Sequence, residues 1–161
     1  MDLLDRLLDH DRWATETLLG VCRELDDAQL DQEFDIGHRT LRATFVHEIE
    51  NIEGWTALMI RQPPQGPPQD TSIPSLTEWH ARMYDTFATF ARQIREEQRF
   101  DDTFSDFYDY PMTFGGGILH VVLHNDEHRT EVVHILSRLG LPEVPEVDHG
   151  LWDFKRRGLG S

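Results

Sequence analysis

Nine of the 161 residues are histidines, and three of them, His120, His124 and His128, follow one another at steps of four. Because an α-helix advances about 100° per residue, residues four apart lie along one face with their Cβ atoms about 5–6 Å apart. Ile135 and Leu139 continue this stripe, so the three imidazoles are expected to point into the core. Two imidazoles at this spacing can converge on one metal ion. The spacing alone does not distinguish the 120/124 pair from the 124/128 pair.

A metal site of this kind needs a further ligand from another helix, since one helix comfortably offers two. His47, in the middle of a second amphipathic segment, is the best candidate. Three histidine ligands would leave a coordination position for water or a substrate, as in catalytic rather than structural zinc sites. The remaining histidines are interpreted as surface or packing residues: His10, His38, His80, His134 and His149.

The residues alone leave two alternatives open. The run from His124 to His128 has the H-x-x-E-H pattern of inverted zinc proteases, in which Glu127 would activate metal-bound water. That class takes its third ligand from well downstream in a larger domain, and the pattern is short enough to arise by chance. In the other alternative no metal binds, and the histidines only form hydrogen bonds with one another.

Four amphipathic segments predict the helices that would carry these residues. In each of them apolar residues recur at steps of three, four or seven, as one buried helix face requires. In the third segment, Ser75-Leu76-Thr77-Glu78 forms a capping box, which predicts a helix start at Ser75. Gly140 and Pro142 predict the end of the fourth. The four predicted helices cover residues 3–25, 41–59, 75–94 and 115–139.

The connections between the segments predict the topology. Residues 63–68 are rich in proline and indicate a long crossover, and residues 26–31 indicate a plain connection. Residues 100–112 are expected to form a partly ordered loop that packs its aromatic side chains, and Trp152 indicates that part of the C-terminal tail packs back. We therefore predict an all-α fold: a single domain over residues 1–161, forming an antiparallel four-helix bundle with a long connection between the second and third helices.

Length and charge restrict the functional classes. A chain of 161 residues with 39% hydrophobic residues can bury one core. Thirty acidic and 15 basic residues give a formal charge of −15, which disfavours nucleic acids and anionic membrane surfaces as partners. Cys22 is the single cysteine, so an internal disulfide cannot form. The sequence lacks a signal-peptide pattern and an apolar run of the roughly 18 residues that a membrane helix needs. We expect a cytoplasmic protein.

Several motifs in order along the chain resemble the DinB/YfiT-like family of bacterial four-helix proteins. The most specific is Leu119-His120-Val121-Val122-Leu123-His124-Asn125-Asp126-Glu127-His128-Arg129. The others are Asp11-Arg12-Trp13-Ala14-Thr15, the run from Thr40 to His47 followed by Trp55, Leu-Gly-Leu-Pro at 139–142, and Asp148 with Trp152. The resemblance implies a divalent metal ion, zinc or nickel, held by His47, His124 and His128. His120 is then an additional histidine that is not usually a ligand.

The resemblance also implies an activity. Relatives with known activity are similar to transferases that use a low-molecular-weight thiol, and to mycothiol-dependent maleylpyruvate isomerase. A metal-dependent transferase acting on a small-molecule substrate is therefore expected, with Glu131 as a group that supports a ligand or handles a proton. Thr130-Glu131 stands where the family often has Gly-Gln, which affects substrate contacts more than metal binding. A metal-dependent hydrolase at the same site and a non-catalytic metal-binding stress-response protein are the alternatives, and a homodimer is compatible with the family.

Overall fold

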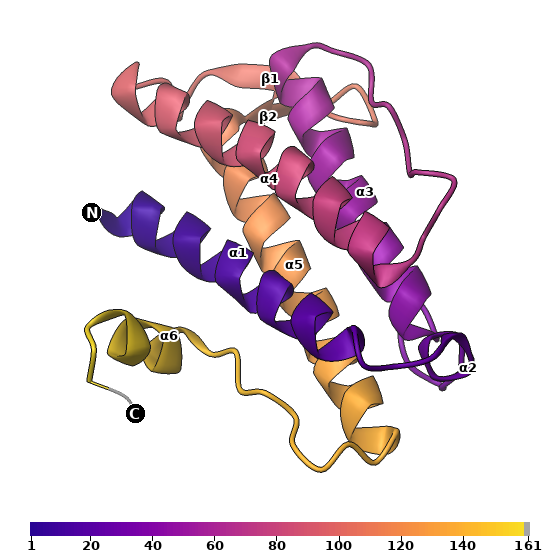
Figure 1. Cartoon of the computed structure of the whole chain (residues 1–161). Helices are drawn as coiled ribbons and strands as arrows, with labels where there is room; N and C mark the ends of the chain where they lie inside the picture. Colours follow the sequence, from indigo (N-terminus) through magenta and orange to yellow (C-terminus); the bar gives the residue numbers. More distant parts are fainter. Residues whose placement is uncertain (160–161) are drawn as a thin grey trace.

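The structure is a computed structural model that describes residues 1–159. Within these residues, helices predominate and one small two-stranded sheet is present, so the prediction of an all-α fold is confirmed. Figure 1 shows the long helices lying alongside one another, with the sheet at one end. The elements in chain order are α1 (Leu3–Cys22), α2 (Asp27–Leu30), α3 (Leu41–Ile60), α4 (Ile73–Glu96), β1 (Thr103–Ser105), β2 (Pro111–Thr113), α5 (Phe114–Arg138) and α6 (His149–Arg156).

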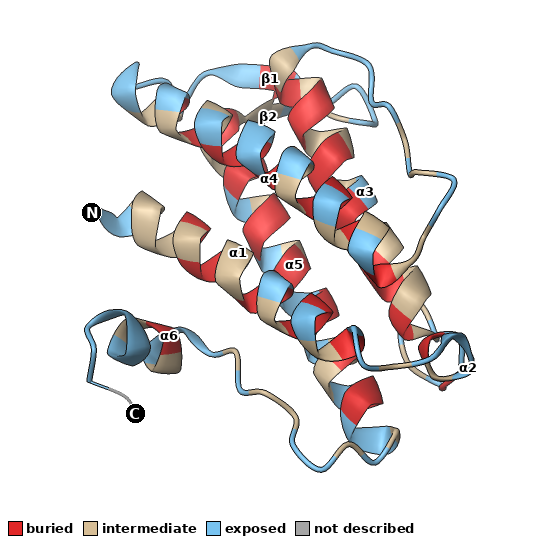
Figure 2. Ribbon diagram, in the orientation of Figure 1, coloured by how far each residue is buried: buried red, intermediate tan, exposed pale blue. Residues whose placement is uncertain are grey.

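The long helices bury their apolar faces against one another. α3 packs against α4 and α5, and α1 packs against α5 and α4. The buried residues lie on the inward faces of these helices, where Figure 2 shows them in red. One apolar cluster surrounds Phe45 and Trp79, and a second surrounds Ile52 and Phe87. The histidine-bearing faces of α3 and α5 are therefore fixed relative to each other by core packing.

One helix start and one connection differ from the sequence prediction. α4 begins at Ile73 rather than at Ser75, with Ser72 at the N-cap and Pro74 in the first turn. Proline suits a first turn because its missing N–H has no partner there in any helix. The Ser72 amide and hydroxyl each donate to the Asp70 carboxylate at 2.8 Å. Residues 26–31 are not a plain connection either, because they contain the short helix α2 with its own capping box.

Residues 100–112 also differ from the expectation of a partly ordered loop. They contain β1 and enter β2, an antiparallel pair in which Phe104 lies opposite Met112. Strands of three residues are too short to display an alternating pattern in the sequence. Phe104 is buried, but Phe107, Tyr108 and Tyr110 are 57%, 80% and 69% exposed, so only part of the expected aromatic packing occurs.

The C-terminal tail packs back on α1, as expected from Trp152, which is buried. Arg6 of α1 forms an ion pair with Asp153 of α6 at 3.0 Å. His10 Nε2 lies 2.8 Å from the Val147 carbonyl oxygen, and the tail buries this histidine. The interpretation of His10 as a packing residue is therefore confirmed.

Cys22, at the end of α1, is a free and buried thiol. Its burial raises its pKa to about 12.

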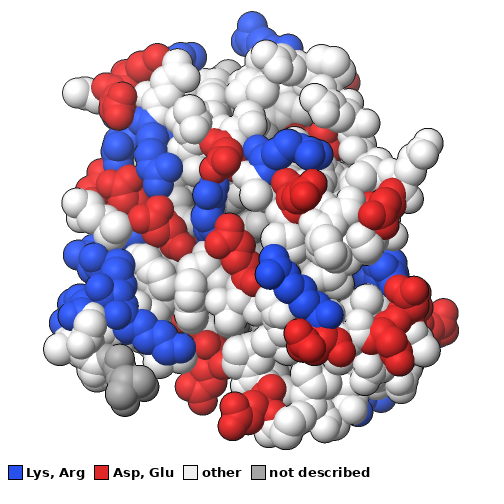
Figure 3. Space-filling model, viewed as in Figure 1, with Lys and Arg blue, Asp and Glu red and all other residues white. Residues whose placement is uncertain are grey.

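Among residues 1–159, no helix has the length and apolar character needed to cross a membrane. On the face seen in Figure 3, acidic and basic side chains are interspersed rather than separated. Arg42, for example, lies between Asp27 and Asp31 at 2.6 and 2.7 Å.

His80 of α4 allows a test of the core by pH. Its side chain is fully buried, and neither ring nitrogen has a hydrogen-bond partner among the described residues. Burial lowers the pKa of His80 to about 3. Because the unfolded chain then binds the proton more readily, stability is present above about pH 6.5 and is lost as the pH falls. Between pH 7 and 5 the wild type is expected to lose about 2 kcal/mol more than His80→Leu.

Urea unfolding of the metal-free proteins at both pH values measures this difference. The His80→Leu variant is the reference for the wild type, because it retains all other histidines. Parallel losses of unfolding free energy in the two proteins would contradict the prediction.

Candidate metal centre

Three histidines predicted from the sequence lie together between α3 and α5. His124 Nε2 of α5 is 3.2 Å from His47 Nε2 of α3 and 3.2 Å from His128 Nε2 of α5. Nitrogen ligands about 2.0–2.1 Å from a tetrahedral ion are themselves about 3.3 Å apart. The two separations that involve His124 Nε2 are therefore close to the spacing of nitrogens that share one ion.

The local environment keeps the imidazoles of His47 and His124 neutral. Burial, followed by the neighbouring His38 and His128, lowers the pKa of His47 to about 4. Burial, followed by His128 and His47, lowers the pKa of His124 to about 3. Near neutral pH both rings are therefore unprotonated, which is the form that binds metal ions.

Glu131 orients one of the rings. The His128 Nδ1–H donates to Glu131 Oε2 at 3.0 Å, which leaves His128 Nε2 as the nitrogen with a free lone pair. Carboxylates commonly hold metal-binding histidines in this way and increase their basicity. The side chain of Glu131 thus supports His128 one turn further along α5.

His38, interpreted from the sequence as a surface or packing residue, also lies in this cluster. His38, His47 and His128 each offer a ligand atom within 4.8 Å of the others, so these three could hold a metal ion. The His38 ring stacks on that of His47 with a centroid separation of 3.9 Å. His38 lies in the turn before α3, where no helical period exists, so the sequence pattern could not place it.

Gly37 lets Glu131 approach the turn. Its φ of +43° is left-handed, and a Cβ built on it would lie 2.0 Å from Glu131 Oε2. Gly37→Ala is therefore expected to displace the carboxylate from His128 and to weaken zinc binding about 10–100-fold. Competition with a chromophoric chelator measures the zinc affinity.

Gly20→Ala is the matched control for that substitution, because nothing lies within 4 Å of the added Cβ. This control is expected to stabilise α1 by about 1 kcal/mol and to leave zinc binding unchanged. Equal zinc affinity in the two alanine variants would contradict the role given to Gly37.

A buried polar network lies behind the histidines and was not found from the sequence. Arg129, next to His128, donates to the buried carboxylate of Asp11 on α1. The same carboxylate accepts from Tyr84 and Asn125, each at 2.9 Å. This network links α1, α4 and α5.

Glu48, next to His47, extends this buried layer. Its carboxyl group accepts from the Thr15 hydroxyl at 2.6 Å. Burial raises the pKa of Glu48 to about 7. The residues were missed because each is polar at a core position, and its partner lies on another helix.

Aromatic rings line α3 and α5 on one side of the cluster. The Trp55 ring lies 4.4 Å from the His120 ring and 5.1 Å from Phe107, between centroids. His120 itself lies 5.7 Å from His124, between centroids. His120 therefore contacts the aromatic row, whereas His47 and His128 are the neighbours of the His124 Nε2 atom.

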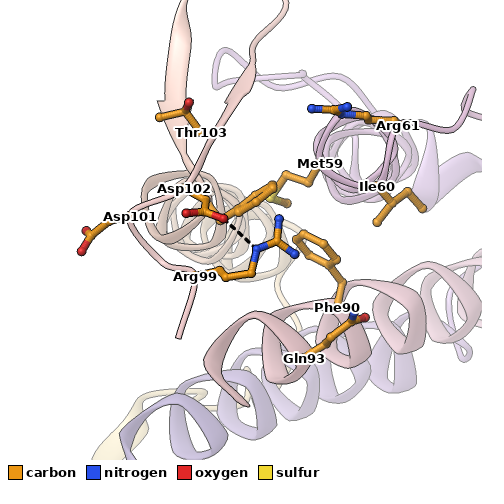
Figure 4. Close-up of a pocket in the computed structure, with 10 residues that line it drawn as sticks. Met59, Ile60, Arg61, Phe90, Gln93, Arg99, Asp101, Asp102 and Thr103 are labelled. Carbon is orange, nitrogen blue, oxygen red and sulfur yellow. Dashed lines mark hydrogen bonds and ion pairs between the residues drawn. The ribbon is translucent and has the colours of Figure 1, made fainter. Parts of the chain in front are cut away.

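A large hollow of about 850 Å³ lies elsewhere, between the C-terminal end of α3, α4 and the segment around Arg99. Figure 4 shows Arg99 paired with Asp102 beside Phe90 and Met59. No histidine lines this hollow. The candidate metal centre is therefore located by its convergent nitrogens rather than by cavity size.

A helical chain with neutral imidazoles converging from two helices defines a candidate metal-binding protein. The family model described as the DinB family matches residues 1–153, so the chain belongs to this family. Among solved structures, it is similar to a DinB-like protein from Bacillus cereus, with a TM-score of 0.65 and 23% identity. That match covers 87% of this chain and 92% of the other. No curated protein matches the chain significantly.

Proposed function

We propose that the protein binds one divalent metal ion through His47, His124 and His128 and works as a metal-dependent transferase on a low-molecular-weight thiol. The observation that supports the ligand set is the position of His124 Nε2, 3.2 Å from the Nε2 atoms of both other histidines. In this proposal residues 1–161 form a single domain, an antiparallel four-helix bundle with the long connection between α3 and α4.

The chemistry follows from the donor set. Zinc or nickel, both suited to imidazole, would lower the pKa of a thiol bound beside the three histidines and so supply a thiolate nucleophile. Glu131 holds the His128 ring, and the buried residues around Arg129 hold the helix that carries it. A small-molecule electrophile is the expected second substrate. A homodimer, a cytoplasmic location and the absence of nucleic-acid and membrane partners stay predictions.

Elemental analysis of the untagged protein after incubation with zinc or nickel tests the site. About one ion per chain is expected for the wild type and for His134→Ala, whose histidine is exposed on the same helix. His124→Ala is expected to lose the ion. Absence of uptake by the wild type would overturn the proposal and leave a histidine-rich protein without a metal.

A thiol titration then separates the transferase from a hydrolase at the same site. With cobalt in place of zinc, 2-mercaptoethanol is expected to produce sulfur-to-metal charge-transfer absorption. A cobalt-loaded protein that never shows this absorption would favour the hydrolase, in which the ion activates water instead.

A further inference from the structure

The turn that carries His38 has an unusual backbone. Gly37 and Arg39, on either side of His38, both have left-handed φ values, +43° and +73°. For a residue with a Cβ this conformation is unfavourable. The turn is closed by Arg39, whose carbonyl accepts from the Phe34 amide and whose own amide donates to Ile36, both at 2.8 Å. Strained backbone of this kind is concentrated at functional sites.

The side chain of His38 has a buried ring nitrogen, Nδ1, that forms no hydrogen bond with the described residues. Glu131 Oε2 lies 3.8 Å away, which is too far for a hydrogen bond. A buried ring nitrogen with no partner is costly, and a bound ion would satisfy it.

The neighbouring rings place His38 beside two of the three proposed ligands, His47 and His128. Its ring lies 3.9 Å from that of His47 and 5.0 Å from that of His128, between centroids. Its ligand atom lies within 4.8 Å of those of both residues. Glu131 lies next to both rings, because its Oε2 is 3.0 Å from His128 Nδ1 and 3.8 Å from His38 Nδ1.

We propose that His38 is a fourth, displaceable ligand of the metal ion, and that it occupies the coordination position that a thiol needs. This inference rests on the proposed metal site. Four histidines would close the site, as in structural zinc centres, whereas three would leave it open. A thiol that displaced His38 would bind as its thiolate and would release its proton to solvent.

Two substitutions separate coordination from ring stacking. His38→Ala removes both, whereas His38→Phe retains a ring that can stack on His47 but has no nitrogen. In cobalt-loaded protein, both variants are expected to show an altered visible d–d spectrum and at least tenfold weaker metal binding. Both are also expected to bind 2-mercaptoethanol at least tenfold more tightly, measured by charge-transfer absorption. His134→Ala, the exposed control, is expected to match the wild type.

The outcomes distinguish this inference from the proposal beneath it. A His38→Phe protein with the spectrum, metal affinity and thiol affinity of the wild type would show that His38 only stacks, and would overturn the inference while leaving the three-histidine site. Failure of the wild type to bind cobalt, zinc or nickel would overturn both. Circular dichroism of each variant establishes that the fold is retained.

Discussion

Replacement of Arg129 by methionine is expected to lower the free energy of unfolding by about 3–5 kcal/mol, because it leaves a buried carboxylate without its counter-charge. The side chains of Arg129 and Asp11 are 2% and 0% exposed. Tyr84 and Asn125 still donate to Asp11 in the variant, but neither carries a positive charge. Urea unfolding of the metal-free protein measures the loss.

Two further variants test this explanation. Arg82→Met removes an exposed arginine of α4 and is expected to change stability by less than about 0.5 kcal/mol. Asp11→Leu combined with Arg129→Met is expected to be more stable than Arg129→Met alone, because the unpaired charge is gone. The charge explanation would be contradicted if the double variant were less stable than Arg129→Met alone by the full cost of a second core substitution.

Removal of the metal is expected to have the second large effect. Free zinc at about a thousand times its dissociation constant should stabilise the folded chain by about 4 kcal/mol, since the folded state alone brings the histidines together. For a chain of this size that corresponds to a rise in Tm of about 10 °C. Calorimetry in a zinc buffer and in excess chelator measures the difference.

The test compares the Tm in the zinc buffer with the Tm in excess chelator, and the difference between them is the measured quantity. His124→Ala is expected to melt at nearly the same temperature with zinc and with chelator, whereas His134→Ala should retain the full zinc-dependent rise. A wild-type Tm that does not respond to the chelator would contradict the metal site.

Much of the fold could be predicted from the sequence, because the apolar periodicity of a helix is a local pattern. The apolar steps in α1, α3, α4 and α5 each bury one face, so their existence could be predicted. The same periodicity placed His120, His124 and His128 on one face and suggested His47 as a partner, but only the family resemblance selected His124 with His128. Finer features could not be predicted in this way. The start of α4 depended on Ser72 and Pro74, and a sheet with strands of three residues leaves no periodic signal.

The parts of the site that sequence analysis missed depend on tertiary contacts. Asp11 and Arg129 are 118 positions apart, and no local pattern pairs them. His38 joins the cluster because a turn with two left-handed residues delivers it there, and only Gly37 signals such a turn by its residue type. Residues that follow no periodic pattern and depend on tertiary contacts therefore cannot be identified before the backbone is known.

The position of Cys22 has a consequence for chemistry that uses an external thiol. Its pKa of about 12 leaves almost no thiolate near neutral pH, and its sulfur is enclosed by the core. A cofactor thiol in its oxidised form would therefore find no accessible thiol on the described chain with which to form a mixed disulfide. The protein would handle reactive sulfur without itself becoming trapped in a mixed disulfide.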